Sequence, residues 1–211
     1  MRIIALMASF LFLITLSPAK AELNEEPNAE KGANEFLSAE QAVNLLKLAP
    51  NLALSGQFIQ KKHFKILKKP FISQGEFNVN DQQFTWRTLT PIKSAVIFKD
   101  NTLYLENAKG ELSKQNKAQN IGYLMQQLLS GQFKQLSQYF SITATTYTDE
   151  PKPCLVLLAT NNSFAQVFKQ IRLCGEGNIS TISLYDPQAN ATDITLSYEQ
   201  AADITNESTN H

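Results

Sequence analysis

The sequence contains few of the residues on which enzyme chemistry usually depends. Its 211 residues include two histidines, two cysteines and a single tryptophan. One histidine, His211, is the last residue, which leaves His63 as the other candidate. The sequence motifs of zinc proteases, serine hydrolases, P-loop proteins and dinucleotide-binding proteins are all absent. These absences argue against an enzyme, and a cysteine–histidine nucleophile would require a free cysteine beside His63.

An excess of charge of either sign is also absent. The chain has 19 basic and 19 acidic residues, so its formal net charge is zero. Proteins that bind nucleic acids usually have a strongly basic face. We therefore expect no nucleic-acid partner and, since no metal or cofactor motif is present, no metal and no cofactor.

Only one long apolar run exists, at Ile3–Leu16. It follows Arg2 and precedes a small-x-small pattern that ends at Ala21, which is typical of a signal peptidase site. The run is shorter than the roughly 20 residues that a spanning helix needs. We predict a signal peptide at 1–21 that is cleaved after Ala21, with an uncleaved membrane anchor as the alternative.

Cleavage of 21 residues from 211 leaves 190, which suffices for a single core. The removed segment holds Arg2, Lys20 and no acidic residue, so 17 basic residues remain against 19 acidic ones. Residues 22–36 are polar and without periodicity, and we predict a flexible leader. We predict one domain at 37–200 and a disordered tail at 201–211.

Apolar and polar residues alternate from Leu54 to Leu105, in short runs separated by turn residues. This alternation predicts a curved antiparallel sheet with one apolar face. We expect its strands near 54–64, 71–80, 83–88, 94–99 and 102–107. The apolar face contains Phe58, Phe64, Phe71, Phe77, Val79, Phe84, Trp86, Val96, Phe98, Leu103 and Leu105.

Two helices are predicted on either side of these strands. Ser38 and Gln41 fit a capping box, and an apolar stripe follows until Pro50: Ala42, Leu45, Leu46 and Ala49. The second helix ends at Ser130-Gly131 and has its own stripe: Ile121, Leu124, Met125, Leu128 and Leu129. A further helical turn is expected around Phe133–Tyr139.

The later part of the chain predicts a second group of strands, near 141–147, 153–160, 167–174, 178–185 and 193–198. Asn161-Asn162-Ser163 reads as a turn, and a hairpin folded about Phe164 would place Cys154 opposite Cys174. We expect a disulfide between them in an exported protein. Two buried free thiols or a redox pair are the alternatives, although redox pairs usually have closer spacing.

Several short motifs resemble the LolA-type outer-membrane lipoprotein carriers. Phe58-Ile59-Gln60-Lys61 resembles their F-x-Q-K, and Ser73-Gln74-Gly75-Glu76-Phe77 resembles the small-x-G-x-aromatic pattern of their second strand. Trp86-Arg87-Thr88-Leu89-Thr90-Pro91 is similar to their W-x-x-x-x-P, and Asp100-Asn101 stands where they have D-G. The order of the later elements matches too, so the resemblance spans roughly 52–199.

This resemblance implies an α+β fold, an unclosed antiparallel β-barrel whose concave face is covered by helices. It also implies a non-enzymatic periplasmic carrier that takes a lipoprotein or glycolipid-type amphiphile from an inner-membrane transporter to an outer-membrane acceptor. We expect such a carrier to be a monomer. An envelope sensor of the same fold, without a transport role, is the alternative.

One difference from the family concerns the latch of the covering helix. The enterobacterial carriers have Arg-Pro in the bend between their second and third strands, where this chain has Val79-Asn80-Asp81-Gln82-Gln83. Because this arginine is missing, two functions remain open. One is a divergent carrier for a glycolipid or another amphiphile, and the other is a carrier of lipoproteins in general. The Asn101 in place of glycine is compatible with a left-handed turn.

The candidate lipid-binding residues are apolar side chains of the sheet and of the second helix. They are Phe58, Phe77, Phe84, Trp86, Val96, Phe98, Leu103, Leu105, Leu124, Met125 and Leu128. An ordinary packed core is the alternative for each of them. A second candidate site is a patch for headgroups or a partner, although lysines there also protect a sheet edge. It comprises Lys61, Lys62, Lys65, Lys68 and Lys69.

Overall fold

The computed structural model describes residues 36–49, 53–116, 119–145 and 152–199. Within them, eleven strands form one antiparallel sheet in the order β6-β5-β4-β3-β2-β1-β11-β10-β9-β8-β7. The strands are β1 (Ala53–His63), β2 (Phe71–Asn80), β3 (Gln83–Thr90), β4 (Ser94–Lys99), β5 (Thr102–Glu106), β6 (Leu112–Gln115), β7 (Phe140–Thr145), β8 (Cys154–Ala159), β9 (Gln170–Glu176), β10 (Asn178–Tyr185) and β11 (Ala191–Tyr198).

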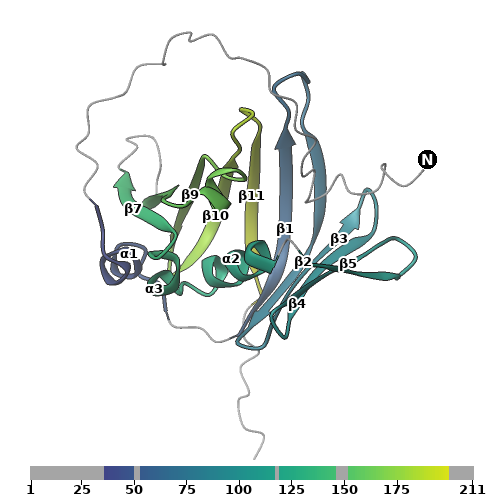
Figure 1. The fold of residues 1–211 in the computed structure, drawn as a ribbon, viewed down its shortest axis with the longest axis horizontal. Helices are drawn as coiled ribbons and strands as arrows, with labels where there is room; N and C mark the ends of the chain where they lie inside the picture. Colours follow the sequence, from purple (N-terminus) through teal and green to yellow (C-terminus); the bar gives the residue numbers. More distant parts are fainter. Residues whose placement is uncertain (1–35, 50–52, 117–118, 146–151, 200–211) are drawn as a thin grey trace, which may run out of the picture.

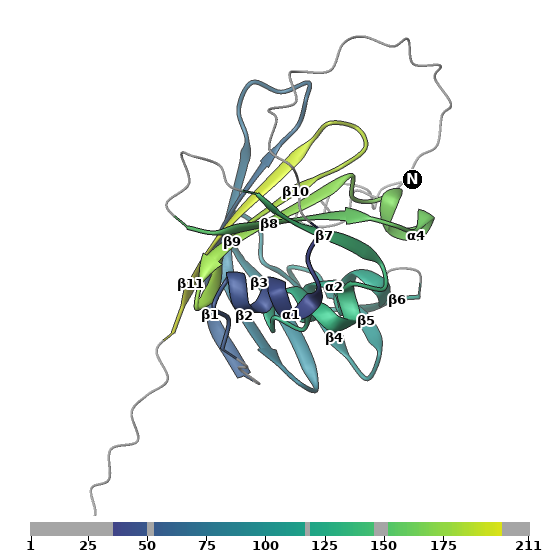
Figure 2. The same cartoon turned by 90° about the vertical axis from the view of Figure 1, so that its left-hand side faces the viewer.

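The sheet has two halves that meet at the pairing of β1 with β11. In this pairing Phe58 lies opposite Leu196, and Gly56 lies opposite Tyr198. Strands β6 and β7 form the two outer edges, and within the described residues they do not pair with each other. The sheet therefore curves without closing, as Figures 1 and 2 show, and the predicted unclosed antiparallel half-barrel is confirmed.

Helices α1, α2 and α3 lie on the concave side of the sheet, whereas α4 lies at the end of β8. The bounds of the four helices are α1 (Ala39–Leu45), α2 (Gln119–Leu129), α3 (Phe133–Leu136) and α4 (Asn162–Ala165). Helix α2 packs against β2, β3, β4 and β5, whereas α1 packs against α3 and β7. Figure 1 shows α2 in front of the sheet, between the two halves. The strands thus supply an apolar surface, and α2 covers its first half.

The first helix is shorter than the sequence predicts. Its capping box forms, since Ser38 Oγ accepts from the Gln41 amide at 3.1 Å and Gln41 Oε1 accepts from the Ser38 amide at 2.8 Å. The helix ends at Leu45 because Lys47 has a left-handed φ of 49°. Of the predicted stripe, Leu46 is fully buried, whereas Leu45 is 37% exposed. The proposed stop, Pro50, lies outside the described residues.

Other boundaries also differ from the predictions. Residues 162–165 form α4, not a simple turn, so β9 begins at Gln170. The sequence analysis missed β6, whose short polar strand pairs with β5. The predicted ends of α2 and of the β4–β5 turn are confirmed, because Gly131 has a φ of 70° and Asn101 a φ of 53°.

The predicted terminal segments lie mostly outside the described residues. This holds for the signal peptide at 1–21 and the tail at 201–211. Of the predicted leader at 22–36, only Phe36 is described, and it forms an isolated antiparallel bridge with Thr143. The proposed domain boundaries therefore remain predictions.

Candidate functional site

The candidate lipid-binding residues lie together on the concave face of the sheet and on α2. Neighbouring strands pair them directly: Phe77 lies opposite Trp86, and Phe98 lies opposite both Phe84 and Leu103. All but Leu105 are buried, and Leu105 is partly buried against the same cluster. The buried set comprises Phe58, Phe77, Phe84, Trp86, Val96, Phe98, Leu103, Leu124, Met125 and Leu128.

Trp86 stands at the centre of an aromatic cluster. The Phe58 ring stacks on its indole with centroids 3.8 Å apart and an interplanar angle of 19°. The rings of Phe77 and Phe84 lie 6.1 Å and 6.2 Å from the indole. Aromatic pairs of this kind add about 0.5–1.5 kcal/mol beyond their buried area. The four rings therefore form one continuous, tightly packed apolar surface.

Gly75 makes room for this stack on the neighbouring strand. It lies opposite Phe58 in the β1–β2 pairing, and a Cβ at its position would come within 2.7 Å of the Phe58 ring. The same Cβ would collide with the backbone oxygen of Arg87. The motif glycine is thus required because the Phe58 ring lies over its Cα.

A second glycine brings α2 close to the sheet. A Cβ on Gly122 would lie 2.6 Å from Cδ2 of Phe98 and 2.8 Å from Cδ1 of Leu103. Each distance is well below the 3.5–4.0 Å of an ordinary carbon contact. Gly122 therefore lets the backbone of α2 rest directly on β4 and β5.

A hydrogen bond fastens α2 to the bend between β2 and β3. The Gln126 side chain is 7% exposed, and its Nε2 donates to the Asn80 carbonyl at 2.8 Å. The Asn80 side chain shapes the bend, because its Oδ1 accepts from the amides of Gln82 and Gln83. The bend that lacks the family's arginine is thus bonded from the helix. The sequence analysis did not identify Gln126 or Gly122.

The second buried glutamine of α2 is not bonded in the same way. Gln127 is 5% exposed, and within the described residues its Oε1 accepts no hydrogen bond. A buried acceptor without a partner costs about 1–3 kcal/mol. The burial of Gln127 therefore carries a local energetic penalty.

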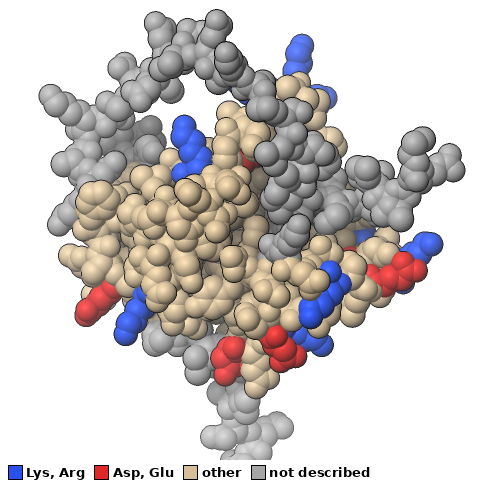
Figure 3. Space-filling view, in the orientation of Figure 1, with Lys and Arg blue, Asp and Glu red and all other residues tan. Residues whose placement is uncertain are grey.

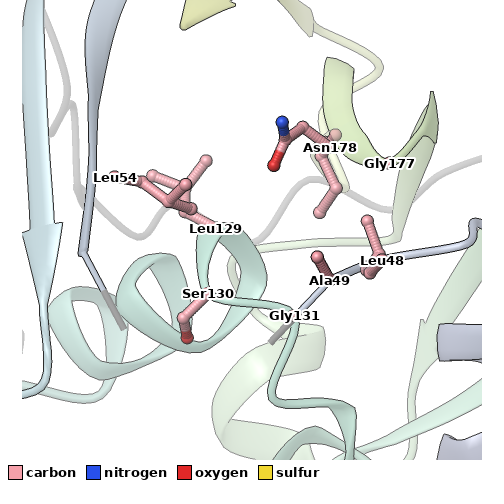
Figure 4. A pocket seen from close by; sticks show the side chains of 9 residues that line it. Leu48, Ala49, Leu54, Leu129, Ser130, Gly131, Gly177 and Asn178 are labelled. Carbon is pink, nitrogen blue, oxygen red and sulfur yellow. The ribbon is translucent and has the colours of Figure 1, made fainter. Parts of the chain in front are cut away.

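The candidate lipid-binding residues of the sheet and of α2 are packed in one apolar cluster. One cavity lies at the carboxyl end of α2, shown in Figure 4, and its volume of about 10 Å³ holds roughly one water molecule. Leu54, Leu129 and Ile179 contribute its apolar wall, and Ser130 and Asn178 lie at its edge. It does not include the candidate lipid-binding residues.

The cysteines form the predicted disulfide. Cys154 and Cys174 are directly opposite in the β8–β9 pairing, with Cα atoms 4.1 Å apart, and their sulfurs are bonded. Neither thiol is free, so the alternatives of free thiols and of a cysteine–histidine nucleophile do not hold. His63 instead lies 3.2 Å from Asp193, measured from Nε2 to Oδ2.

The candidate lysines surround the β1–β2 turn, which projects from the sheet in Figures 1 and 2. Lys61, Lys65, Lys68 and Lys69 are exposed. Lys62 is partly buried, with its Nζ 5.1 Å from the centre of the Phe64 ring, and burial lowers its pKa. The structure thus gathers four of the five lysines in solvent.

The rest of the described chain offers little else for chemistry. In that part, no three histidine, cysteine or acidic side chains gather in a way that could hold a metal ion. None of its helices combines the length and the apolar character of a membrane span. The candidate functional site is therefore the apolar interior beneath α2.

Comparison with known proteins identifies the family. The sequence profile of "Outer membrane lipoprotein carrier protein LolA" matches residues 51–208. No curated protein sequence matches the chain. Among solved structures, a LolA superfamily protein from Nitrosomonas europaea is 8% identical, with a TM-score of 0.44 over 76% of this chain and 92% of that one. A DUF1329 family protein from Desulfovibrio piger is also 8% identical, with a TM-score of 0.44 over 77% and 92%. The profile covers most of the sequence, and the chain therefore belongs to the LolA family of outer-membrane lipoprotein carriers.

Proposed function

We propose that this protein shields the acyl chains of a lipoprotein or another amphiphile beneath α2 and carries that cargo through the periplasm. The donor is an inner-membrane transporter, and the acceptor lies at the outer membrane. Proteins of the LolA family are periplasmic and non-enzymatic, which supports this function. In this proposal the signal peptide is cleaved after Ala21, and the mature protein works as a monomer without enzymatic activity.

The observation that carries the proposal is the kind of contact that α2 makes with the sheet. Leu124, Met125 and Leu128 are fully buried in the same cluster as Trp86 and Phe98. These contacts are apolar and without directional bonds, and an acyl chain offers the same kind of surface. Each methylene hidden from water contributes about 0.8 kcal/mol. Cargo can therefore replace the side chains of α2 against the sheet.

The attachment of α2 suits a helix that must leave its place. Gln126 forms one side-chain hydrogen bond to the sheet, whereas the buried Oε1 of Gln127 accepts none within the described residues. Outward movement breaks the first contact, and it lets water reach the second. The two changes oppose each other, so these polar groups add little to the cost of opening. Because the chain has no nucleotide-binding motif, cargo passes on to whichever site buries it better.

The first test is native mass spectrometry, followed by lipid extraction, of mature protein from the periplasm of its own organism. We expect a copurifying acylated protein or amphiphile, whose mass identifies the cargo. The mass of the polypeptide also locates the cleavage site. A protein that is empty and that also ignores added acyl chains would overturn the carrier function and leave the aromatic face as a core only.

A second test fastens α2 in its closed position. A Cβ at Gly122 would lie 2.8 Å from the Cγ of Phe98, which is one bond from the Cβ of Phe98. The two Cβ atoms are therefore close enough for a disulfide, which spans about 3.5–4.5 Å between them. The double variant Phe98→Cys with Gly122→Cys, when oxidised, should lose uptake of a fluorescent fatty acid. The control is the same double variant after reduction, which should take up more fatty acid than its oxidised form. Equal uptake by the oxidised and the reduced double variant would contradict the proposed movement.

A further inference from the structure

The turn between β1 and β2 exposes large apolar side chains at the end of a projecting hairpin. We call residues 64–72 the hairpin tip. Ile66 is 88% exposed, Leu67 47%, Phe71 58% and Ile72 51%. An exposed apolar patch of this kind usually marks a surface that binds something. Figures 1 and 2 show the hairpin extending beyond the neighbouring strands.

Positive charge is interspersed with these apolar side chains. Lys65, Lys68 and Lys69 are exposed within the hairpin tip, and Lys61 is exposed just before it. The sequence has no acidic residue between positions 53 and 75. Figure 3 shows blue side chains at the projecting end of the molecule. The hairpin tip is therefore both apolar and cationic.

The base of the hairpin tip has a defined structure. The Leu67 amide donates to the Phe64 carbonyl at 2.9 Å, which closes the turn. The Phe64 and Phe71 rings meet edge to face with centroids 5.6 Å apart. On the side of β11, the Lys65 amide donates to Asn190 Oδ1 at 3.1 Å. These contacts fix the backbone of the turn around Ile66 and Leu67, so little conformational entropy is lost when the two side chains bind.

We propose that the hairpin tip docks on an anionic bilayer, with Ile66 and Leu67 entering the interfacial region and the lysines meeting lipid phosphates. Interfacial binding grows with buried apolar area and with attraction to anionic lipids, and the tip supplies both. A narrow turn is too small for a stable protein interface, which buries about 1,200–2,000 Å². This docking is independent of the proposed cargo, because it does not involve the interior beneath α2.

Vesicle sedimentation of the mature protein, without cargo, tests the docking. The probes are vesicles of phosphatidylcholine alone and vesicles in which about one lipid in three is phosphatidylglycerol. The second composition gives the vesicle surface a strong negative charge. We expect at least tenfold stronger binding to the anionic vesicles, with the difference falling as salt is raised. Absence of binding to anionic vesicles at low salt would overturn the proposal.

Matched variants separate the two contributions. Lys68→Gln with Lys69→Gln should weaken binding to anionic vesicles by about 30-fold, since each lysine near such a surface contributes roughly fivefold. The control, Lys109→Gln with Lys114→Gln, removes the same charge from exposed positions elsewhere and should have a much smaller effect. Equal losses in both pairs would overturn the role of the hairpin tip.

The apolar contribution has its own control. Leu67→Asp should reduce binding at least tenfold, whereas Leu158→Asp should leave it nearly unchanged. Leu158 is 40% exposed on β8, which is four strands away from β1 in the sheet order. Equal losses in the two variants would contradict insertion.

A fluorescent variant reports insertion directly. Leu67→Trp adds one indole to a chain whose native Trp86 is 1% exposed. We expect a blue shift on addition of anionic vesicles, and quenching by brominated lipids. Unchanged emission, or binding to polyglutamate without binding to vesicles, would overturn the proposal and assign the lysines to an acidic protein surface.

Discussion

Gln126 on α2 donates a hydrogen bond from Nε2 to the backbone oxygen of Asn80, at 2.8 Å. The two residues are 46 positions apart, and the bond joins the covering helix to the bend between β2 and β3. In the enterobacterial carriers that the sequence resembles, an arginine of that bend contributes to the latch. Here the donor belongs to the helix, and the bend supplies a backbone acceptor.

Replacement of this glutamine should loosen α2. Gln126→Leu keeps the volume of the side chain but leaves the Asn80 oxygen without its donor, which should lower the free energy of unfolding by about 1–3 kcal/mol. We expect faster amide exchange in 119–129 as well. Denaturant titration and hydrogen exchange with mass spectrometry measure the two effects.

Gln127→Leu is the matched control on the same helix. It removes a buried oxygen that accepts no hydrogen bond within the described residues, so it should be neutral or stabilising. If both variants lost the same stability, the bond to Asn80 would have no special part in holding α2.

The contact of Gly122 with the sheet predicts a steric effect. Gly122→Ala places a methyl group against Phe98 and Leu103, and such overpacking costs about 1–3 kcal/mol. Alanine also favours the helix by about 1 kcal/mol, so we expect a net loss of up to about 2 kcal/mol in the free energy of unfolding. The control Asn120→Ala, at an exposed position of α2, should be slightly stabilising. A stabilised Gly122→Ala protein would show that α2 has room to shift.

The Cys154–Cys174 bond should stabilise the second half of the sheet. The two residues are 20 positions apart, and a loop of this length corresponds to about 3 kcal/mol in the chain-entropy description. The double variant to alanine should lose that amount in denaturant titration. Thiol titration of the denatured protein should find no thiol before reduction and two after it. Two reactive thiols before reduction would refute the disulfide.

Tyr198 predicts a dependence of stability on alkaline pH. Its hydroxyl donates to the Ile179 carbonyl at 2.7 Å, and burial raises its pKa above the ordinary 10.0. Above pH 10 the unfolded chain loses the phenolic proton while the folded protein retains it. The stabilisation is therefore complete below pH 10 and falls by about 1.4 kcal/mol per pH unit above it.

Tyr198→Phe should remove this fall. Denaturant titrations at pH 8, 10 and 11 should show the stabilities of wild type and variant converging as pH rises. Burial lowers the pKa of Lys62, which has the opposite sign, but this contribution is common to both proteins and cancels. The control Tyr104→Phe, on β5, should keep the wild-type slope. Parallel curves for wild type and Tyr198→Phe would refute the prediction.

The alternating pattern of the sequence predicted which side chains share the concave face. A strand period of two places Phe84 and Trp86 on one side whatever the rest of the chain does, and the pairing of β3 with β4 then adds Val96 and Phe98. The disulfide was predictable for a similar reason, because a hairpin centred near Phe164 brings the two cysteines to one register.

Features that depend on distant parts of the chain were not predictable in this way. The bond from Gln126 to Asn80 spans two halves of a packed interface, and nothing local to either residue indicates it. The early end of α1 depends on the left-handed backbone of Lys47. A glycine is the usual sequence signal for such a helix end, and this position has none. The burial of Gln126 and Gln127 between Met125 and Leu128 likewise became apparent only in the structure.

The strand order has a mechanical consequence. Helices α2 and α3 connect β6 to β7, and these are the two outermost strands of the same sheet. The covering helices are thus joined at both ends to the edge strands of the curved sheet. If the sheet flattened, β6 and β7 would move apart and the segment between them would be stretched. If the sheet curved further, the same segment would be relaxed. The curvature of the eleven-stranded sheet and the position of α2 are therefore linked through the two edge strands.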